Sequence, residues 1–136
     1  MPKKTYYVEW IEENNDRLTL KRRKIVSPKG YKPIFYKIRD KYIDISIPLY
    51  SERETDKLIQ KGIYTGLFKR IKIKTKGYIH SARIVTESGR VVETSKWQIG
   101  YNKKLFDLVK KYNIRIRWDP EKGYYYERVK KKRRKR

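Results

Sequence analysis

The sequence predicts an α+β protein, with a mixed sheet in a helix–three strands–helix–strand core, N-terminal β-hairpins and a disordered basic C-terminal tail. Three observations predict this class. Several short segments alternate apolar and polar residues, which is typical of half-buried strands. Two other segments show a helix cap or helical spacing of apolar residues. The last nine residues, 128–136, hold eight Lys or Arg and a single Val, too little apolar surface for a core.

The first 48 residues are expected to form strands. Segments 5–12 and 17–26 are rich in aromatic and β-branched residues and flank a turn at residues 14–16, so they predict a hairpin. Two more strands are predicted at 34–38 and 42–47. We therefore expect an N-terminal strand region (residues 1–48) packed on an α+β core (residues 49–127), followed by the tail (residues 128–136).

A helix and three strands are predicted next. Ser51 precedes Glu54 by three residues, which is a capping box, and Gly62 should end this helix after Lys61. Segment 70–75 alternates basic and apolar residues, so it predicts a half-buried strand with a basic outer face. Strands over 78–86 and 90–95 should follow.

The second helix is predicted over residues 102–112. Leu105, Leu108, Val109 and Tyr112 fall on one stripe of such a helix, and Asn113 is expected to close it. Strands at 114–118 and 124–129 complete the predicted order.

The composition indicates a polyanionic partner. The formal net charge is +23, from 38 Lys and Arg against 15 Asp and Glu, and residues 1–127 hold 30 of those 38 cations. Such a balance favours nucleic acid over a membrane, because no amphipathic helix has a broad apolar face and no apolar run is long enough to span a bilayer. The N-terminus does not resemble a secretory signal.

Absence of Cys excludes disulfides, thiol nucleophiles and cysteine-ligated zinc. Two Gln and four Asn suit a protein from a hot environment.

Two windows concentrate the positive charge: residues 17–39 hold nine Lys or Arg without an acid, and residues 57–86 hold eight. Aromatic residues are interleaved with them, and these could stack on bases or serve the core. The residues that we expect to contact nucleic acid are Arg22, Arg23, Lys24, Arg70, Lys72, Lys74, Lys76, Arg115, Arg117, Lys130, Lys131, Lys132, Arg133, Arg134, Lys135 and Arg136.

Catalytic signals are sparse. His80 is the only histidine, and no spacing pairs it with a partner, so a structural role is favoured. No glycine-rich phosphate loop with a following Lys-Ser/Thr pair is present. We expect a protein that is not an enzyme and that needs no metal or cofactor.

Residues 77–129 resemble the RecB-like, CRISPR-associated branch of the PD-(D/E)xK nucleases, in a degenerate form. Segment 77–82 stands where the family has a metal-binding Asp and contains none. Glu93 matches the acid of the second motif, but a serine replaces its lysine. The positions that the resemblance singles out are His80, Glu93, Ser95, Lys96, Gln98 and Tyr101. The resemblance implies a restriction-endonuclease-like fold without activity, since one carboxylate does not replace the usual pair around a divalent ion.

A basic, inactive scaffold of this kind is similar to the nucleocapsid protein of a filamentous virus of hyperthermophilic archaea. That similarity implies a protein that coats or packages viral double-stranded DNA, self-associates on it, favours DNA over RNA, and is found in the virion or the host cytoplasm. Two alternatives stay open. One is a ribosomal or ribosome-associated RNA-binding protein, and the other is an active metal-dependent nuclease that requires Glu93.

Overall fold

The computed structural model describes residues 3–29, 31–96 and 99–131. Strands account for 58% of the structure and helices for 15%, so the protein is mostly β and the predicted α+β class is wrong. The elements of the described residues are β1 (Lys3–Asn14), β2 (Arg17–Pro28), β3 (Ile34–Arg39), β4 (Tyr42–Pro48), α1 (Glu52–Gln60), β5 (Phe68–Lys74), β6 (Tyr78–Thr86), β7 (Val91–Thr94), α2 (Lys103–Lys111), β8 (Tyr112–Asp119) and β9 (Gly123–Lys131).

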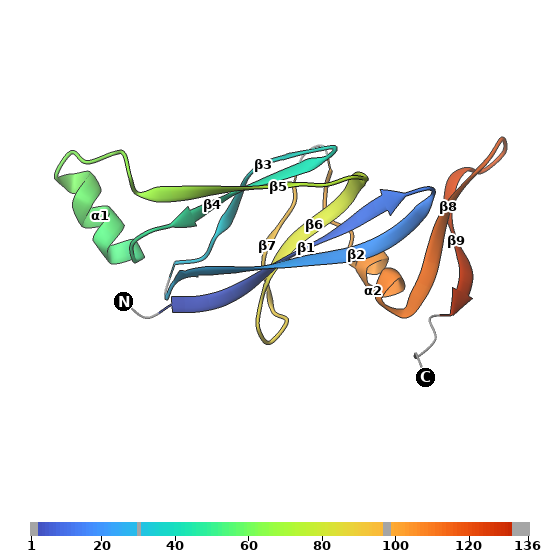
Figure 1. The fold of residues 1–136 in the computed structure, drawn as a ribbon, viewed down its shortest axis with the longest axis horizontal. Helices are drawn as coiled ribbons and strands as arrows, with labels where there is room; N and C mark the ends of the chain where they lie inside the picture. The colour runs from blue at the N-terminus through green and yellow to red at the C-terminus, as the bar shows by residue number, and fades with distance from the viewer. Residues whose placement is uncertain (1–2, 30, 97–98, 132–136) are drawn as a thin grey trace.

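The strands form two antiparallel sheets (Figure 1). The large sheet has the order β7-β6-β1-β2-β8-β9, and the small sheet has the order β3-β4-β5. The hairpin predicted near the N-terminus is confirmed, and β1 and β2 pair from Lys3 opposite Pro28 to Asn14 opposite Arg17. Asn15 and Asp16 make the turn with positive φ angles of 51° and 63°, the conformation that two-residue hairpin turns require.

The predicted helix–three strands–helix–strand core is wrong because its strands belong to different sheets. β5 pairs with β4, whereas β6 pairs with β1 and β7. The apolar residues of β5 meet an isoleucine-rich partner, with Ile73 opposite Ile43 and Ile71 opposite Ile45. α1 lies at one end of the small sheet and α2 against the large sheet, so the two helices do not flank a common sheet as in a restriction-endonuclease-like core (Figure 1).

Two apolar clusters hold the layers together. The first lies between the sheets, where Val8 and Ile84 of the large sheet meet Ile43, Ile45 and Ile47 of β4. Each fully buried isoleucine contributes about 1.5–3 kcal/mol, so β4 supplies most of the attraction that fastens the small sheet. The second lies on the opposite face of the large sheet and consists of Ile11, Leu18, Leu105, Phe106, Val109 and Ile114, three of them from α2. Residues of β1 therefore belong to both clusters, because neighbouring residues on a strand point to opposite sides of the sheet.

The helices match their predicted starts but not both ends. Ser51 caps α1 by accepting a hydrogen bond of 3.2 Å from the Glu54 amide, as predicted. Asn113, however, does not close α2: the helix ends at Lys111, and Tyr112 already has extended backbone as the first residue of β8. Pairing with β9 satisfies the backbone there and replaces the left-handed cap. Neither helix of the described chain has the length and apolar character needed to cross a bilayer.

The start of the basic tail also differs from the prediction. Residues 128–131 continue β9, with Arg128 opposite Ile114 and Lys131 opposite Tyr112. The guanidinium of Arg128 lies 4.5 Å from the centre of the Tyr112 ring. A strand partner and an aromatic ring therefore order the beginning of a segment whose charges predicted a disordered chain. Residues 132–136 lie outside the described part.

Candidate nucleic-acid interface

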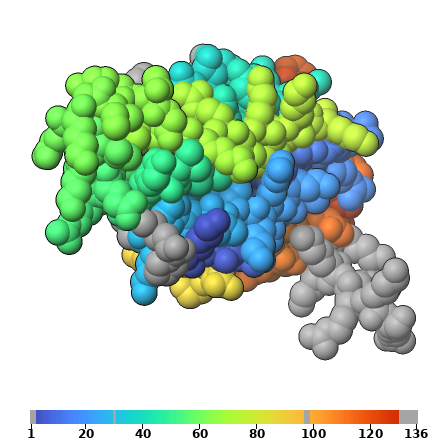
Figure 2. All heavy atoms as spheres, turned by 60° about the vertical axis from the view of Figure 1, so that its left-hand side comes forward, coloured from blue at the N-terminus to red at the C-terminus, as the bar shows by residue number. Residues whose placement is uncertain are grey.

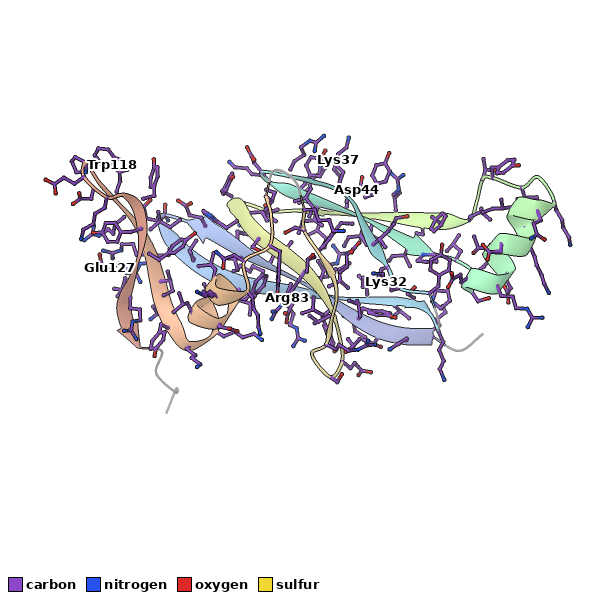
Figure 3. The ribbon with its side chains drawn as sticks, turned by 180° about the vertical axis from the view of Figure 1, so that it is seen from behind. Lys32, Lys37, Asp44, Arg83, Trp118 and Glu127 are labelled. Atoms are coloured by element: carbon purple, nitrogen blue, oxygen red, sulfur yellow. The ribbon has the colours of Figure 1, made fainter. Side chains whose placement is uncertain are left out.

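The outer face of the small sheet is strongly basic. Residues of β4 alternate between the core and this face, so Ile43 and Ile45 point inward while Asp44 points outward. In register, Asp44 lies between Lys37 of β3 and Lys72 of β5. We define the basic face by the cations Lys37, Arg39, Arg70, Lys72 and Lys74, with Tyr36, Tyr42 and Asp44 among them; all five cations are exposed. In Figure 2 the side chains of β5 project from the surface, and Figure 3 shows Lys37 pointing away from the large sheet.

Aromatic rings position two of these cations. The guanidinium carbon of Arg70 lies 3.1 Å from the Tyr36 ring centre, and the Lys72 ammonium lies 4.1 Å from the Tyr42 ring centre. A cation over a ring loses side-chain freedom yet keeps its positive charge. Arg70 also approaches Asp44 at 4.0 Å. Because Asp44 is the single acid among five cations, the face stays positive after this ion pair.

Three predicted contact residues, Arg22, Arg23 and Lys24, lie exposed on β2. Their side chains alternate between the two sides of the sheet, so they do not form one row. Arg22 is partly neutralised by Glu9, at 3.5 Å, and its guanidinium carbon lies 3.9 Å from the Tyr7 ring centre. β2 therefore offers scattered cations, whereas the basic face offers an ordered set.

The predicted cations of β8 are offset by an acid. Arg117 donates a hydrogen bond of 2.9 Å to Glu127, and this bond together with the carboxylate charge raises the pKa of Arg117 above its usual value. Arg115 is half-buried and stands opposite the same Glu127 in register. Lys76 is exposed in the turn after β5. Lys130 and Lys131 have their backbone in β9, but their side chains, and all of Lys132, Arg133, Arg134, Lys135 and Arg136, lie outside the described part.

The residues singled out by the nuclease resemblance lie in different parts of the fold and make unrelated contacts. His80 bonds to Glu13, with 2.8 Å between Nε2 and Oε1. Glu93 is half-buried on β7 and lies 3.9 Å from the ammonium of Lys32. Lys96 is exposed, and Gln98 lies outside the described residues.

Ser95 and Tyr101 make structural contacts. The Ser95 hydroxyl donates to the carbonyl of Gly100 and accepts a bond of 3.1 Å from the Ala82 amide, so it ties the end of β7 to β6. Tyr101 accepts a bond of 3.5 Å from Arg83 and packs its ring against Phe106. These two residues, singled out as degenerate nuclease positions, hold segments of the fold together.

Lys37 and Arg39 also belong to the basic face, although they are not among the cations that the sequence led us to expect at an interface, and β3 has a register shift beside them. Register shifts between Phe35 and Lys37, so simple alternation along the strand misassigns part of its outer face. The sequence signal that could have identified these cations is their two-residue spacing at the end of a predicted strand.

The described residues include no group of three or more His, Asp or Glu placed to hold a metal ion. Comparisons with protein-family models, with curated proteins and with solved structures found no match to this chain.

Proposed function

We propose that the protein binds nucleic acid without catalysing a reaction on it, and that it coats or packages double-stranded DNA through phosphate contacts. The observation that carries this proposal is the basic face: five cations from two strands on one uncovered sheet surface, with a single acid among them.

Sheet geometry supports phosphate contact from this face. Arg70, Lys72 and Lys74 are two residues apart along β5, so their Cα atoms span roughly 13 Å. Neighbouring strands lie about 4.8 Å apart, which places Lys37 of β3 two strands across from this row. Cations carried by strands bind phosphates without the entropy cost of ordering a flexible backbone segment. Phosphate contacts carry no sequence information, which suits a coating protein.

Duplex DNA is proposed over single strands because of charge density. A duplex presents one charge per about 1.7 Å of its axis, and contact with Lys and Arg releases its condensed counterions. The cations of β2 and of residues 132–136 add to those of the basic face, and a densely charged polymer can engage several such surfaces at once.

A salt titration with matched variants tests the proposal. For about eight neutralised phosphates, the slope of log affinity against log salt is near −7. We expect the triple variant R70Q/K72Q/K74Q to reduce the magnitude of this slope by roughly 2–3, because each lost contact removes about 0.9. The control K103Q/K104Q/K110Q removes three exposed cations of α2 and should leave the slope nearly unchanged.

Equal losses in the two triple variants would show that only net charge matters, and the assignment of the basic face would be wrong.

Titrations of duplex DNA, duplex RNA and single-stranded DNA of equal length test the partner. A clear preference for RNA would instead favour the ribosome-associated alternative. Cleavage of DNA in Mg²⁺ or Mn²⁺ that is lost in Glu93→Ala would contradict the non-enzymatic part.

A further inference from the structure

The β8–β9 hairpin has an apolar face that extends beyond the core. Ile114 is buried under α2, and Ile116 is half-buried opposite Tyr126. Farther out, Trp118 stands opposite Tyr124, with exposed fractions of 62% and 79%. Figures 1 and 3 show this end of the hairpin projecting from the body, with Trp118 at its tip. Two large aromatic side chains on a projecting two-stranded ribbon are typical of an interaction surface.

The turn at the tip is slightly acidic, in contrast to the basic face. It contains Asp119, Glu121 and Lys122, so acids outnumber cations there. Asp119 Oδ1 accepts hydrogen bonds from the amides of Glu121 and Lys122, at 2.8 and 3.2 Å, which hold the turn in shape. Carboxylates beside exposed aromatic residues would repel phosphates, so this tip suits a protein partner with an apolar and basic surface.

A groove with those properties lies between β3 and the end of β7. It has a volume of about 460 Å³, within the range of pockets that hold small molecules, and so it accommodates a large aromatic side chain. Phe35 and Ile38 contribute apolar lining. Lys37 and Arg39, which also belong to the basic face, line it together with Lys96, and Glu93 is the one acid among the described lining residues.

We propose that the tip of the β8–β9 hairpin of one copy docks into the β3–β7 groove of a second copy. Trp118 or Tyr124 would fill the apolar part of the groove, while Asp119 or Glu121 meets Lys96, the lining cation that does not belong to the basic face. The contact joins two different surfaces, so it repeats head to tail and builds an open chain unless its rotation closes a ring. Contact between two hairpin tips is disfavoured, because it would bring acid against acid. The inference rests on the proposed coating function, for which repeated self-association is the required property.

Two variants with different defects test the contact without nucleic acid. W118S/Y124S removes the docking tip, and T94R fills the groove, since Thr94 is part of its lining. Each variant alone should lose self-association, with the dissociation constant raised by at least ~100-fold, because a buried aromatic anchor dominates such contacts. Mixed in equal amounts, they should form one-to-one heterodimers and nothing longer, because one intact tip meets one intact groove. Sedimentation velocity at several concentrations measures these states.

Several outcomes would overturn the inference. These are a monomeric wild-type protein at every concentration, a W118S/Y124S variant that associates like the wild type, or a mixture that stays monomeric. Circular dichroism must show that both variants fold; if T94R does not, Thr94→Gln serves as a milder block of the same groove. Because DNA affinity is measured separately at dilute protein, a failed contact and a failed nucleic-acid function give different results.

Discussion

Glu9 is a buried carboxylate in the large sheet, and it pairs with two arginines from its neighbouring strands. Arg83 of β6 lies at 2.8 Å and Arg22 of β2 at 3.5 Å. Arg83 is buried too, and its guanidinium carbon lies 4.1 Å from the Phe106 ring centre. Arg83 belongs to an acid-free window of the sequence, yet its charge is used inside the fold.

Replacing Arg83 by Met tests this structural role. We expect the free energy of unfolding to fall by about 3–5 kcal/mol, because Glu9 would stay buried with only the half-exposed Arg22 nearby. Urea unfolding followed by circular dichroism measures the change. Arg90→Met, at an exposed position, should shift stability by less than about 0.5 kcal/mol. Similar effects of the two substitutions would contradict the role given to the buried pair.

Glu12 makes stability depend on pH. Burial by itself would raise the pKa of this carboxyl, but bonds from Trp10, Asn14 and the Gly77 amide, at 3.0, 2.8 and 3.3 Å, outweigh it. The pKa of Glu12 is therefore below its usual value of 4.5. A carboxyl whose pKa is lowered by folding stabilises the protein above the unfolded pKa, and this contribution is lost as pH falls through the folded pKa.

We expect Glu12→Gln to lower the free energy of unfolding at pH 7 by about 1–3 kcal/mol, since three donors lose a charged acceptor. Its difference from the wild type should shrink as the pH falls well below 4.5, where the wild-type carboxyl becomes protonated as well. Urea titrations at neutral pH and at a pH well below 4.5 make the comparison. A difference of the same size under both conditions would argue against an ionised Glu12 as the source.

At the scale of elements, the alternation of β5 places residues of the core next to residues of the basic face. Ile73 is buried between the sheets, and Lys72, its neighbour, is exposed on the basic face. Neighbouring residues of one strand point to opposite sides, so single substitutions can affect the core and spare the basic face, or the reverse.

We expect Ile73→Ala to lower the free energy of unfolding by about 2–5 kcal/mol through the cavity it leaves. Lys72→Ala should leave unfolding within about 0.5 kcal/mol of the wild type but weaken DNA binding and reduce its salt slope by about 0.9. Urea unfolding and salt-dependent DNA titration are measured on both variants, so that each variant is the control for the other. Loss of stability in Lys72→Ala would mean that its contact with Tyr42 matters more to the fold than to binding.

At the scale of the whole molecule, the end of β9 divides the C-terminal cations into two groups. Residues 128–131 are paired with β8, whereas residues 132–136, all five of them Lys or Arg, follow the last described strand. Removing residues 132–136 keeps the whole described β8–β9 ladder and should reduce the magnitude of the salt slope by at most about 4.5. Removing residues 128–136 should also destabilise the protein, because the end of the β8–β9 ladder is lost.

DNA titration and urea unfolding of both truncated proteins test this division. Binding should become weaker in the shorter truncation without disappearing, since the basic face remains. Complete loss of DNA affinity on removal of residues 132–136 alone would mean that the tail is the whole interface, and the proposal for the small sheet would be wrong.

Local signals in the sequence predicted most of the elements. The hairpin turn at Asn15 and Asp16, the cap at Ser51 and the alternation of β5 each depend on residues within a few positions of one another. For the same reason, the alternation of β5 was enough to predict that Arg70, Lys72 and Lys74 form one exposed row.

Strand partners were decided only by the tertiary structure. Local periodicity places β5 and β6 in succession, but whether they share a sheet depends on which distant apolar face each one meets, and β5 joins β4 while β6 joins β1. The same long-range pairing brought Lys37 onto the sheet that carries the β5 row and drew Arg128 into β9. By itself, the sequence determined the strands and their charges. Which charges lie on the same face was decided by the burial of isoleucines between the two sheets, because this contact joins remote segments of the chain.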